Sequence, residues 1–238
     1  MINKILNLLA TSSMIFYNYK FGRNIGAVSD ANFDNIAITP EKGAFKIWII
    51  IYLYLAFYSI KQFFLYPSSI NETIKDEINF TYIISCMLNI LWIYLFSKGT
   101  KYYINLSIIV LFLLRFVIEN IYNKINKRED ETGEKSCYSD GFTIYVAWLI
   151  IASLLNIRIL IENNNIEFVD KENMDNYLQI FIIGLGMGYR LFKKTPNFLF
   201  NGVFALFFFF LYNKNKDSKS ALGFLTNIFN SFTILIKK

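Results

Sequence analysis

The chain contains four apolar stretches of about 20 residues, separated by polar, charged segments. They comprise residues 45–65, 78–97, 102–122 and 142–161. A helix rises about 1.5 Å per residue, so each stretch is long enough to cross a hydrocarbon core of about 30 Å. The first stretch follows Thr39-Pro40, which is a helix-start signal. The pattern predicts an all-α integral membrane protein with multiple transmembrane helices.

Shorter apolar segments extend this pattern in both directions. Residues 1–17 contain one lysine and predict a retained first span, because no A-x-A-like cleavage site precedes the polar residues that follow. Residues 177–192 and 197–213 are marginal spans, which bring the expected number to seven. Residues 219–236 predict either a surface helix or an eighth, short span. The block 123–140 carries mixed charge without periodicity and predicts a solvated loop.

Composition narrows the classes of function. The chain has no histidine and two cysteines without CxxC spacing, which nearly excludes zinc, haem-histidine and Cys-His nucleophile chemistry. The net charge of +6 lies in loops and the tail without a nucleic-acid-binding motif, so anionic lipid headgroups explain it better. We therefore expect a lipid-embedded protein that binds no nucleic acid, has no catalytic residues or metal site, requires no cofactor and is not an enzyme.

All three tryptophans lie within apolar stretches, on helix faces that also carry amide or aromatic side chains. An unpaired amide in hydrocarbon costs several kcal/mol, so the asparagines must face other helices or a cavity. Helix packing explains any one stripe, but three stripes together make a shared ligand cavity an equally good explanation. The stripes consist of Phe45, Trp48 and Tyr52; of Ser85, Asn89, Trp92 and Phe96; and of Tyr145, Trp148, Ala152 and Asn156.

Three further features stand out in the apolar stretches: an Arg–Glu pair, a single arginine and a glycine-rich segment. Arg115 and Glu119 lie four residues apart and form either a structural ion pair or part of a proton or transport pathway. Arg158, near the end of its stretch, is expected to extend to the headgroups. The glycines of residues 184–188, GLGMG, have no preceding strand and predict close helix packing instead of a phosphate loop.

Taken in order, these motifs resemble the tryptophan-rich sensory protein and translocator protein family, TspO/MBR. The resemblance covers about residues 1–162 and accounts for every tryptophan. Three family features are absent: the second proline before the second helix is missing, the W-x-P of the third helix reads Trp92-Ile93-Tyr94, and the sequence around Gly141-Phe142 replaces a Pro-Tyr pair. The matching motifs are Ile38-Thr39-Pro40, Trp48 to Tyr52, Leu88-Asn89-Ile90-Leu91-Trp92, and Trp148 to Asn156.

The resemblance implies a five-helix bundle over residues 1–162, followed by two additional spans in 163–213 and a basic, amphipathic tail in 214–238. It also implies that the aromatic cavity binds a hydrophobic small molecule, either a tetrapyrrole such as protoporphyrin IX or haem, or a sterol. Compact relatives tend to pair, so a homodimer is expected. The ligand-binding residues implied are Phe45, Trp48, Tyr52, Asn89, Trp92, Tyr145, Trp148, Ala152 and Asn156.

The leading hypothesis is a multi-pass membrane protein that binds such a ligand for transport or sensing. One alternative is a secondary transporter that uses Arg115 and Glu119. Another is a non-catalytic structural subunit, in which the tryptophans matter only for stability.

Overall fold

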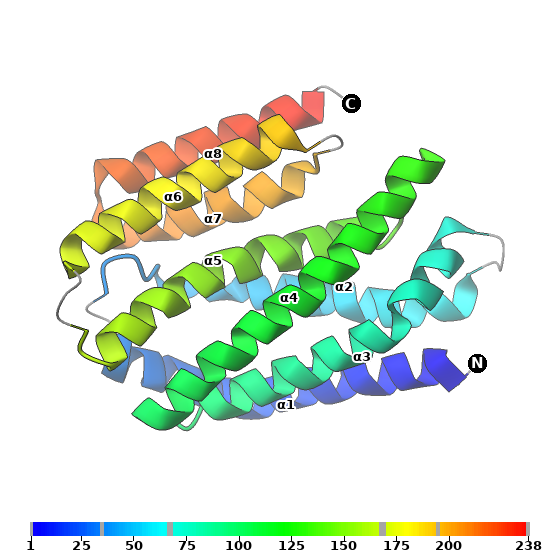
Figure 1. Ribbon diagram of the computed structural model, residues 1–238, viewed down its shortest axis with the longest axis horizontal. Coiled ribbons are helices and arrows are strands. Elements are labelled where there is room, and N and C mark those ends of the chain that lie inside the picture. The colour runs from blue at the N-terminus through cyan, green and yellow to red at the C-terminus, as the bar shows by residue number, and fades with distance from the viewer. Residues whose placement is uncertain (1, 34–35, 66–68, 167–169, 194–195, 237–238) are drawn as a thin grey trace. The chain divides into compact units, whose positions relative to one another are not determined.

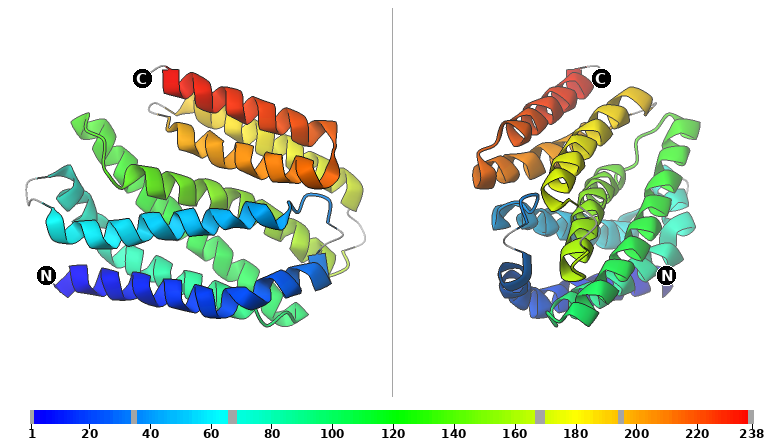
Figure 2. Two further views of the ribbon diagram at one scale, coloured as in Figure 1. Left: turned by 180° about the vertical axis from the view of Figure 1, so that it is seen from behind. Right: turned by 60° about the vertical axis from the view of Figure 1, so that its left-hand side comes forward.

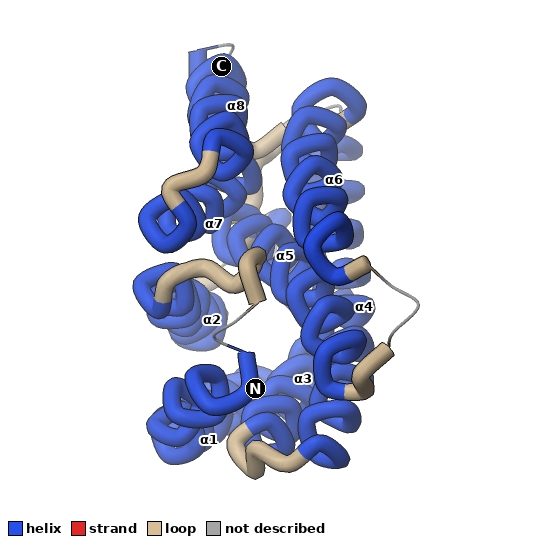
Figure 3. Tube along the Cα trace, turned by 90° about the vertical axis from the view of Figure 1, so that its left-hand side faces the viewer, coloured by secondary structure: helices blue, strands red, loops and turns tan. Residues whose placement is uncertain are grey.

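The structure is a computed structural model that describes residues 2–33, 36–65, 69–166, 170–193 and 196–236. The predicted ranges 1–17, 1–162 and 214–238 each include residues outside this described part of the chain. Helices alone form the regular structure of the described chain (Figures 1 and 3). Four described segments are long and apolar enough to cross a membrane, which confirms an all-α integral membrane fold, whereas seven spans stay a prediction. They are Lys42–Phe64, Ile70–Phe96, Lys101–Thr132 and Ser139–Asn163.

The chain forms two compact units. The first combines Met1–Val28 with Trp48–Val146, and the second combines Ser29–Ile47 with Ala147–Lys238. The boundaries expected after residues 162 and 213 stay a prediction.

The first unit is built from long helices. It contains most of α1 (Ile2–Phe33), then α2 (Ile47–Lys61) with the short 3-10 helix η2 (Gln62–Phe64), α3 (Ile70–Phe96), α4 (Lys101–Thr132) and the start of α5 (Ser139–Asn163). Helices α3 and α4 pack against each other as a hairpin. Gly99 forms the turn between them at a φ of 69°, in the left-handed region that glycine adopts without strain.

Helix α4 corrects the prediction of a solvated loop over residues 123–140. The helix continues through the charged residues and ends only at Thr132, where Gly133 adopts a left-handed conformation. Ion pairs with α3 explain the extension, because Arg128 Nε donates to Glu77 Oε1 at 2.7 Å and Lys124 Nζ donates to the Glu77 carbonyl at 3.1 Å. The charged sequence therefore forms the solvated end of a membrane helix.

The second unit contains the 3-10 helix η1 (Lys42–Lys46), the rest of α5, and α6 (Lys171–Phe192), α7 (Phe198–Asn215) and α8 (Ser218–Ile236). The last three helices pack side by side (Figures 1 and 2). Asn201 Nδ2 in α7 donates to the Gly186 carbonyl at 2.8 Å and to Asn227 Oδ1 at 3.0 Å. A Cβ at Gly186 would collide with Asn227, so this glycine allows close helix packing, as predicted for GLGMG.

Arg158 differs from the expected extended side chain, because it is buried and paired with two carboxylates. It is 4% exposed, and its Nε and Nη1 atoms donate to Asp175 Oδ1 and Glu162 Oε2, both at 2.8 Å. Glu162 lies one turn along the same helix, whereas Asp175 lies on α6. The paired carboxylates compensate the guanidinium, so it is stable without reaching the headgroup region.

Candidate functional site

The aromatic part of the candidate site lies in the first unit, where α2, α3 and α5 contribute rings. Trp48 stacks on Trp92 with ring centroids 5.3 Å apart and an interplanar angle of 29°. Tyr52 also stacks on Trp48, with ring centroids 5.7 Å apart, and Tyr145 meets Trp48 edge-on at 5.8 Å. We call Trp48, Tyr52, Trp92 and Tyr145 the aromatic cluster. Offset stacking and edge-to-face contacts are the arrangements that aromatic rings favour.

A network of uncharged polar groups lies directly beside the aromatic cluster. Asn89 is fully buried, accepts from Asn18 Nδ2 at 2.6 Å and donates to the Tyr145 hydroxyl at 3.0 Å. The Tyr52 hydroxyl donates to Asn18 Oδ1 at 2.6 Å. Both atoms of the Asn89 amide therefore have partners from other helices, which removes the penalty of an unpaired amide in hydrocarbon.

Asn18 is a residue that the sequence analysis missed. It belongs to a buried polar stripe on α1, in which Asn7 Nδ2 donates to Gln62 Oε1 at 2.9 Å and Thr11 hydrogen-bonds both Ser59 and Tyr82. The spacing of Asn7, Thr11 and Asn18 places them on one helix face. That spacing was visible in the sequence, but the segment lacks a tryptophan that would draw attention to it.

The remaining predicted ligand-binding residues lie in the second unit. Phe45 in η1 meets Trp148 in α5 edge-on, with centroids 5.8 Å apart. About two turns further along α5, Asn156 Nδ2 donates to the Ala152 carbonyl at 2.8 Å within the same helix. The nine predicted residues therefore form two groups, and their binding role stays a prediction.

Exposure distinguishes the rings within the aromatic cluster. Trp92 and Tyr145 are buried, whereas Trp48 and Tyr52 are partly exposed. Trp48 stacks on one face of Trp92. The Trp92 Nε1 donor is buried and has no hydrogen-bond partner among the described residues. The exposed part of the aromatic cluster therefore belongs to Trp48 and Tyr52.

The chemistry of the cluster is that of a neutral, apolar surface. Its polar groups are amides, hydroxyls and an indole, none of which changes charge near neutral pH. In the described chain, no three His, Cys, Asp or Glu side chains lie together in a way that could hold a metal ion. The arrangement supports stacking and hydrogen bonding rather than bond cleavage.

Arg115 and Glu119 form an ion pair on α4, with Arg115 Nε and Glu119 Oε2 3.7 Å apart. Their side chains are 29% and 39% exposed, so neither is enclosed in the core. The geometry is that of a neutralised pair one helical turn apart, and no contact joins it to the aromatic cluster among the described interactions.

Together, the long apolar helices, their buried amide pairs and the aromatic cluster define an integral, multi-pass helical membrane protein. The sequence profile of the TSPO-like protein family matches residues 4–237, which is almost the whole chain, so the protein belongs to the TSPO-like family. The match includes α6 to α8, beyond the first 162 residues that carried the motifs. Neither the curated proteins nor the solved structures contain a match to this chain.

Proposed function

We propose that the protein binds a flat hydrophobic molecule, of the porphyrin, haem or sterol class, on the aromatic cluster within the membrane. The observation that carries this proposal is the stacked pair of Trp48 and Trp92, which is backed by the fully hydrogen-bonded Asn89 amide. A stacked pair whose outer ring, Trp48, is partly exposed is suited to contact with another planar ring system.

Three physical features favour such a ligand. The partly exposed rings of Trp48 and Tyr52 provide contact area at little conformational cost. The cluster carries no net charge, so burying an apolar ligand against it does not desolvate an ion. Hydrogen bonds from Asn89 to Tyr145 and from Tyr52 to Asn18 hold the rings in place, which lowers the ordering cost of binding.

The binding is non-covalent, which agrees with a family that is generally non-enzymatic. Transport or sensing of the ligand would follow from binding, and pairing of two chains would place two sites in one assembly. In the second unit, Phe45 and Trp148 form a separate aromatic contact, and Asn156 Oδ1 is buried without a described partner.

The alternative of a secondary transporter rests on the Arg115 and Glu119 pair in an otherwise apolar helix. It predicts proton-coupled flux in reconstituted vesicles that Glu119→Gln abolishes. Ligand binding to the aromatic cluster predicts that Glu119→Gln leaves affinity unchanged, so this variant separates the two functions.

Binding is tested by titrating purified protein in nanodiscs with protoporphyrin IX, haem and cholesterol in turn. We expect saturable binding of at least one ligand, and at least tenfold weaker binding by Trp48→Leu, which corresponds to about 1.4 kcal/mol. The matched control is Phe116→Leu, because Phe116 is an exposed aromatic ring on α4. Equal affinities of Trp48→Leu and the wild type, or no saturable binding of any ligand, would contradict the proposal.

A further inference from the structure

One end of the first unit concentrates buried polar atoms that have no hydrogen-bond partner among the described residues. It is the end where η2, the start of α3 and the start of α5 lie, away from the aromatic cluster. Three of the residues concerned, Asn7, Tyr58 and Tyr138, are at most 2% exposed. The five unpartnered atoms are Asn7 Oδ1, the Tyr58 hydroxyl, Glu72 Oε2, Asn79 Oδ1 and the Tyr138 hydroxyl.

Contacts between helices connect these residues. The rings of Tyr58 and Tyr138 meet edge-on, with centroids 4.8 Å apart. Gln62 joins Asn7 to this pair, because it accepts from the Asn7 amide at 2.9 Å and donates to the Tyr58 carbonyl at 3.1 Å. Glu72 and Asn79 lie seven residues apart on α3, so they share one face of that helix.

Tyr82 connects this face to the phenol pair. Its ring centroid lies 4.4 Å from that of Tyr58, and it follows Asn79 by three residues on α3. Unlike the hydroxyl of Tyr58, the Tyr82 hydroxyl is bonded to Thr11 and Ser59. The unpartnered atoms therefore border a hydrogen-bonded group that reaches into the bundle.

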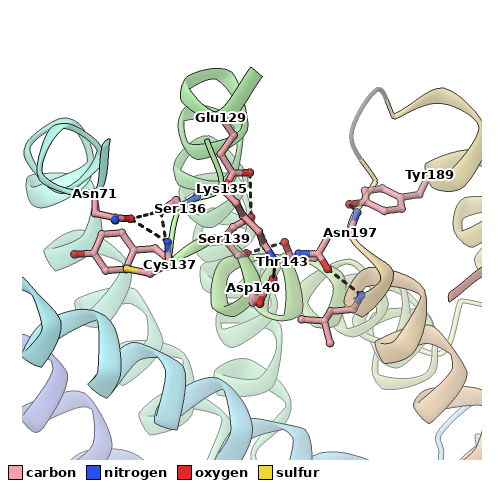
Figure 4. Close-up of polar contacts among 12 residues, drawn as sticks. Asn71, Glu129, Lys135, Ser136, Cys137, Ser139, Asp140, Thr143, Tyr189 and Asn197 are labelled. Carbon is pink, nitrogen blue, oxygen red and sulfur yellow. Dashed lines mark hydrogen bonds and ion pairs between the residues drawn. The ribbon is translucent and has the colours of Figure 1, made fainter. Parts of the chain in front are cut away.

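The loop before α5 fixes Tyr138 in place. Asn71 Oδ1 accepts from the Ser136 hydroxyl and the Cys137 backbone N–H, both at 2.9 Å, and Glu129 Oε1 accepts from the Ser136 backbone N–H at 2.6 Å (Figure 4). Burial raises the pKa of Tyr138, so its phenol stays protonated and able to donate. The Tyr138 ring is 2% exposed and packs against Tyr58, so its hydroxyl lies within the bundle.

The five atoms require an occupant that both donates and accepts hydrogen bonds. The phenols offer two donors, whereas the amide and carboxylate oxygens accept only. A buried polar atom without a partner costs about 1–3 kcal/mol, so five of them together would be a large penalty. Lys4 and Lys75 pair with Glu72, and Lys75 also pairs with Asp76, so the local charges balance and do not favour an ion.

We propose that this end of the first unit holds a cluster of bound water molecules between the phenols of Tyr58 and Tyr138 and the oxygens of Asn7, Glu72 and Asn79. Buried water typically makes two to four hydrogen bonds to polar groups of this kind. The water reaches inward to the three mutually hydrogen-bonded hydroxyls of Thr11, Ser59 and Tyr82. Beyond it on α1 lies Met14, which is 1% exposed and ends the hydrated region before Asn18.

This water site is independent of ligand binding at the aromatic cluster. Its direct test is X-ray hydroxyl-radical footprinting of the protein in nanodiscs, because radiolysis of bound water oxidises the side chains that it touches. Tyr58 and Tyr138 are expected to be oxidised at least threefold faster than Tyr145, which is equally buried and whose hydroxyl is bonded to Asn89. Equal oxidation rates of the three tyrosines would overturn the proposal.

Thermal unfolding of phenylalanine variants gives a second test. If water bonds the phenols, Tyr58→Phe and Tyr138→Phe lower the melting temperature, because each removes a satisfied hydrogen bond. The control is Tyr177→Phe, which alters a 69% exposed tyrosine and leaves the melting temperature unchanged. If the phenols are unsatisfied, both variants raise the melting temperature, which would contradict bound water.

Discussion

Asn89 is a polar residue in the middle of an apolar helix, and its environment explains how the bundle tolerates it. Both of its amide atoms bond to other helices, one to Asn18 and the other to Tyr145. Its anomaly in the sequence correctly predicted an inward-facing residue, but its partners came from α1 and α5 and could not be read from local spacing. The burial of a polar residue can be predicted when its neighbours in the sequence are apolar, whereas its hydrogen-bond partners depend on tertiary packing.

Replacing Asn89 by leucine is expected to destabilise the protein by about 1–2 kcal/mol, because the Tyr145 hydroxyl and Asn18 both lose a partner. The measurement is the free energy of unfolding in mixed detergent micelles. Asn120→Leu is the control, since Asn120 is exposed on α4. Equal stability of Asn89→Leu and Asn120→Leu would show that the network contributes nothing.

Asp217 provides a pH-dependent prediction at the start of α8. Partial burial opposes its ionisation, but hydrogen bonds from the Ser220 hydroxyl and backbone N–H, at 2.6 and 2.8 Å, outweigh this effect and lower its pKa. A carboxyl group with a depressed folded-state pKa stabilises above its unfolded pKa of about 3.9, and this contribution disappears as the pH falls.

Asp217→Ala is therefore expected to destabilise α8 by about 1 kcal/mol at pH 7, as the loss of a helix cap does. The difference from the wild type should shrink as the pH falls below the unfolded pKa of about 3.9 and through the lower folded-state pKa, because the wild-type carboxyl then becomes protonated. Thermal unfolding across this pH range measures the difference. A gap between the two proteins that stays constant with pH would refute the role of the ionised carboxylate.

At the scale of helices, the sequence predicted the apolar centres well and the ends poorly. The apolar stretch 102–122 lies within α4, but the helix continues for ten residues because Arg128 and Lys124 bond to Glu77 of α3. A local charge pattern looks the same in a loop and in the solvated end of a helix. Only the position of α3 distinguishes them.

Glu77→Gln is expected to loosen this end of α4 with little change in global stability, because the pair with Arg128 is partly exposed and screened by solvent. Hydrogen–deuterium exchange should show faster exchange in residues 124–132, and high salt should reduce the difference. Lys127→Gln, which alters a 75% exposed side chain, should leave exchange unchanged. Unaltered protection in Glu77→Gln would show that the ion pair does not hold the helix end.

Helix α8 has its polar face inside and its apolar face outside. Ser220, Asn227 and Asn230 are buried, whereas Leu225 and Phe229 are 62% and 59% exposed. This inverted pattern suits a helix whose outer face contacts lipid. Its 19 residues span about 28 Å, which is close to the thickness of a hydrocarbon core of about 30 Å.

We predict that the outer face of α8 is shielded by lipid. In a variant without native cysteines, Leu225→Cys in liposomes should resist a water-soluble maleimide and become reactive after detergent is added. Lys219→Cys, at the exposed start of the helix, should react in both conditions. Equally rapid labelling of the two positions in liposomes would place the outer face of α8 in water.

At the scale of the whole molecule, composition and hydropathy were sufficient to predict an all-α integral membrane protein, and the order of the tryptophan motifs was sufficient to predict its family. Hydropathy indicates whether a helix is surrounded by lipid or by water, and it therefore predicts membrane spans. It does not report which helices pack together, so the grouping of residues 29–47 with the C-terminal half was not predicted. For the same reason, hydropathy could not predict that the nine candidate residues form two groups.

The central claim is that the accessible stacked tryptophan binds a flat ligand. It is tested most directly by following the fluorescence of a variant that keeps Trp48 alone, with Trp92→Phe and Trp148→Phe, during titration with protoporphyrin IX in nanodiscs. We predict saturable quenching of Trp48 with a midpoint within about threefold of the wild type. Quenching that rises linearly without saturation, at a rate equal to that of free tryptophan in the same membranes, would contradict the account.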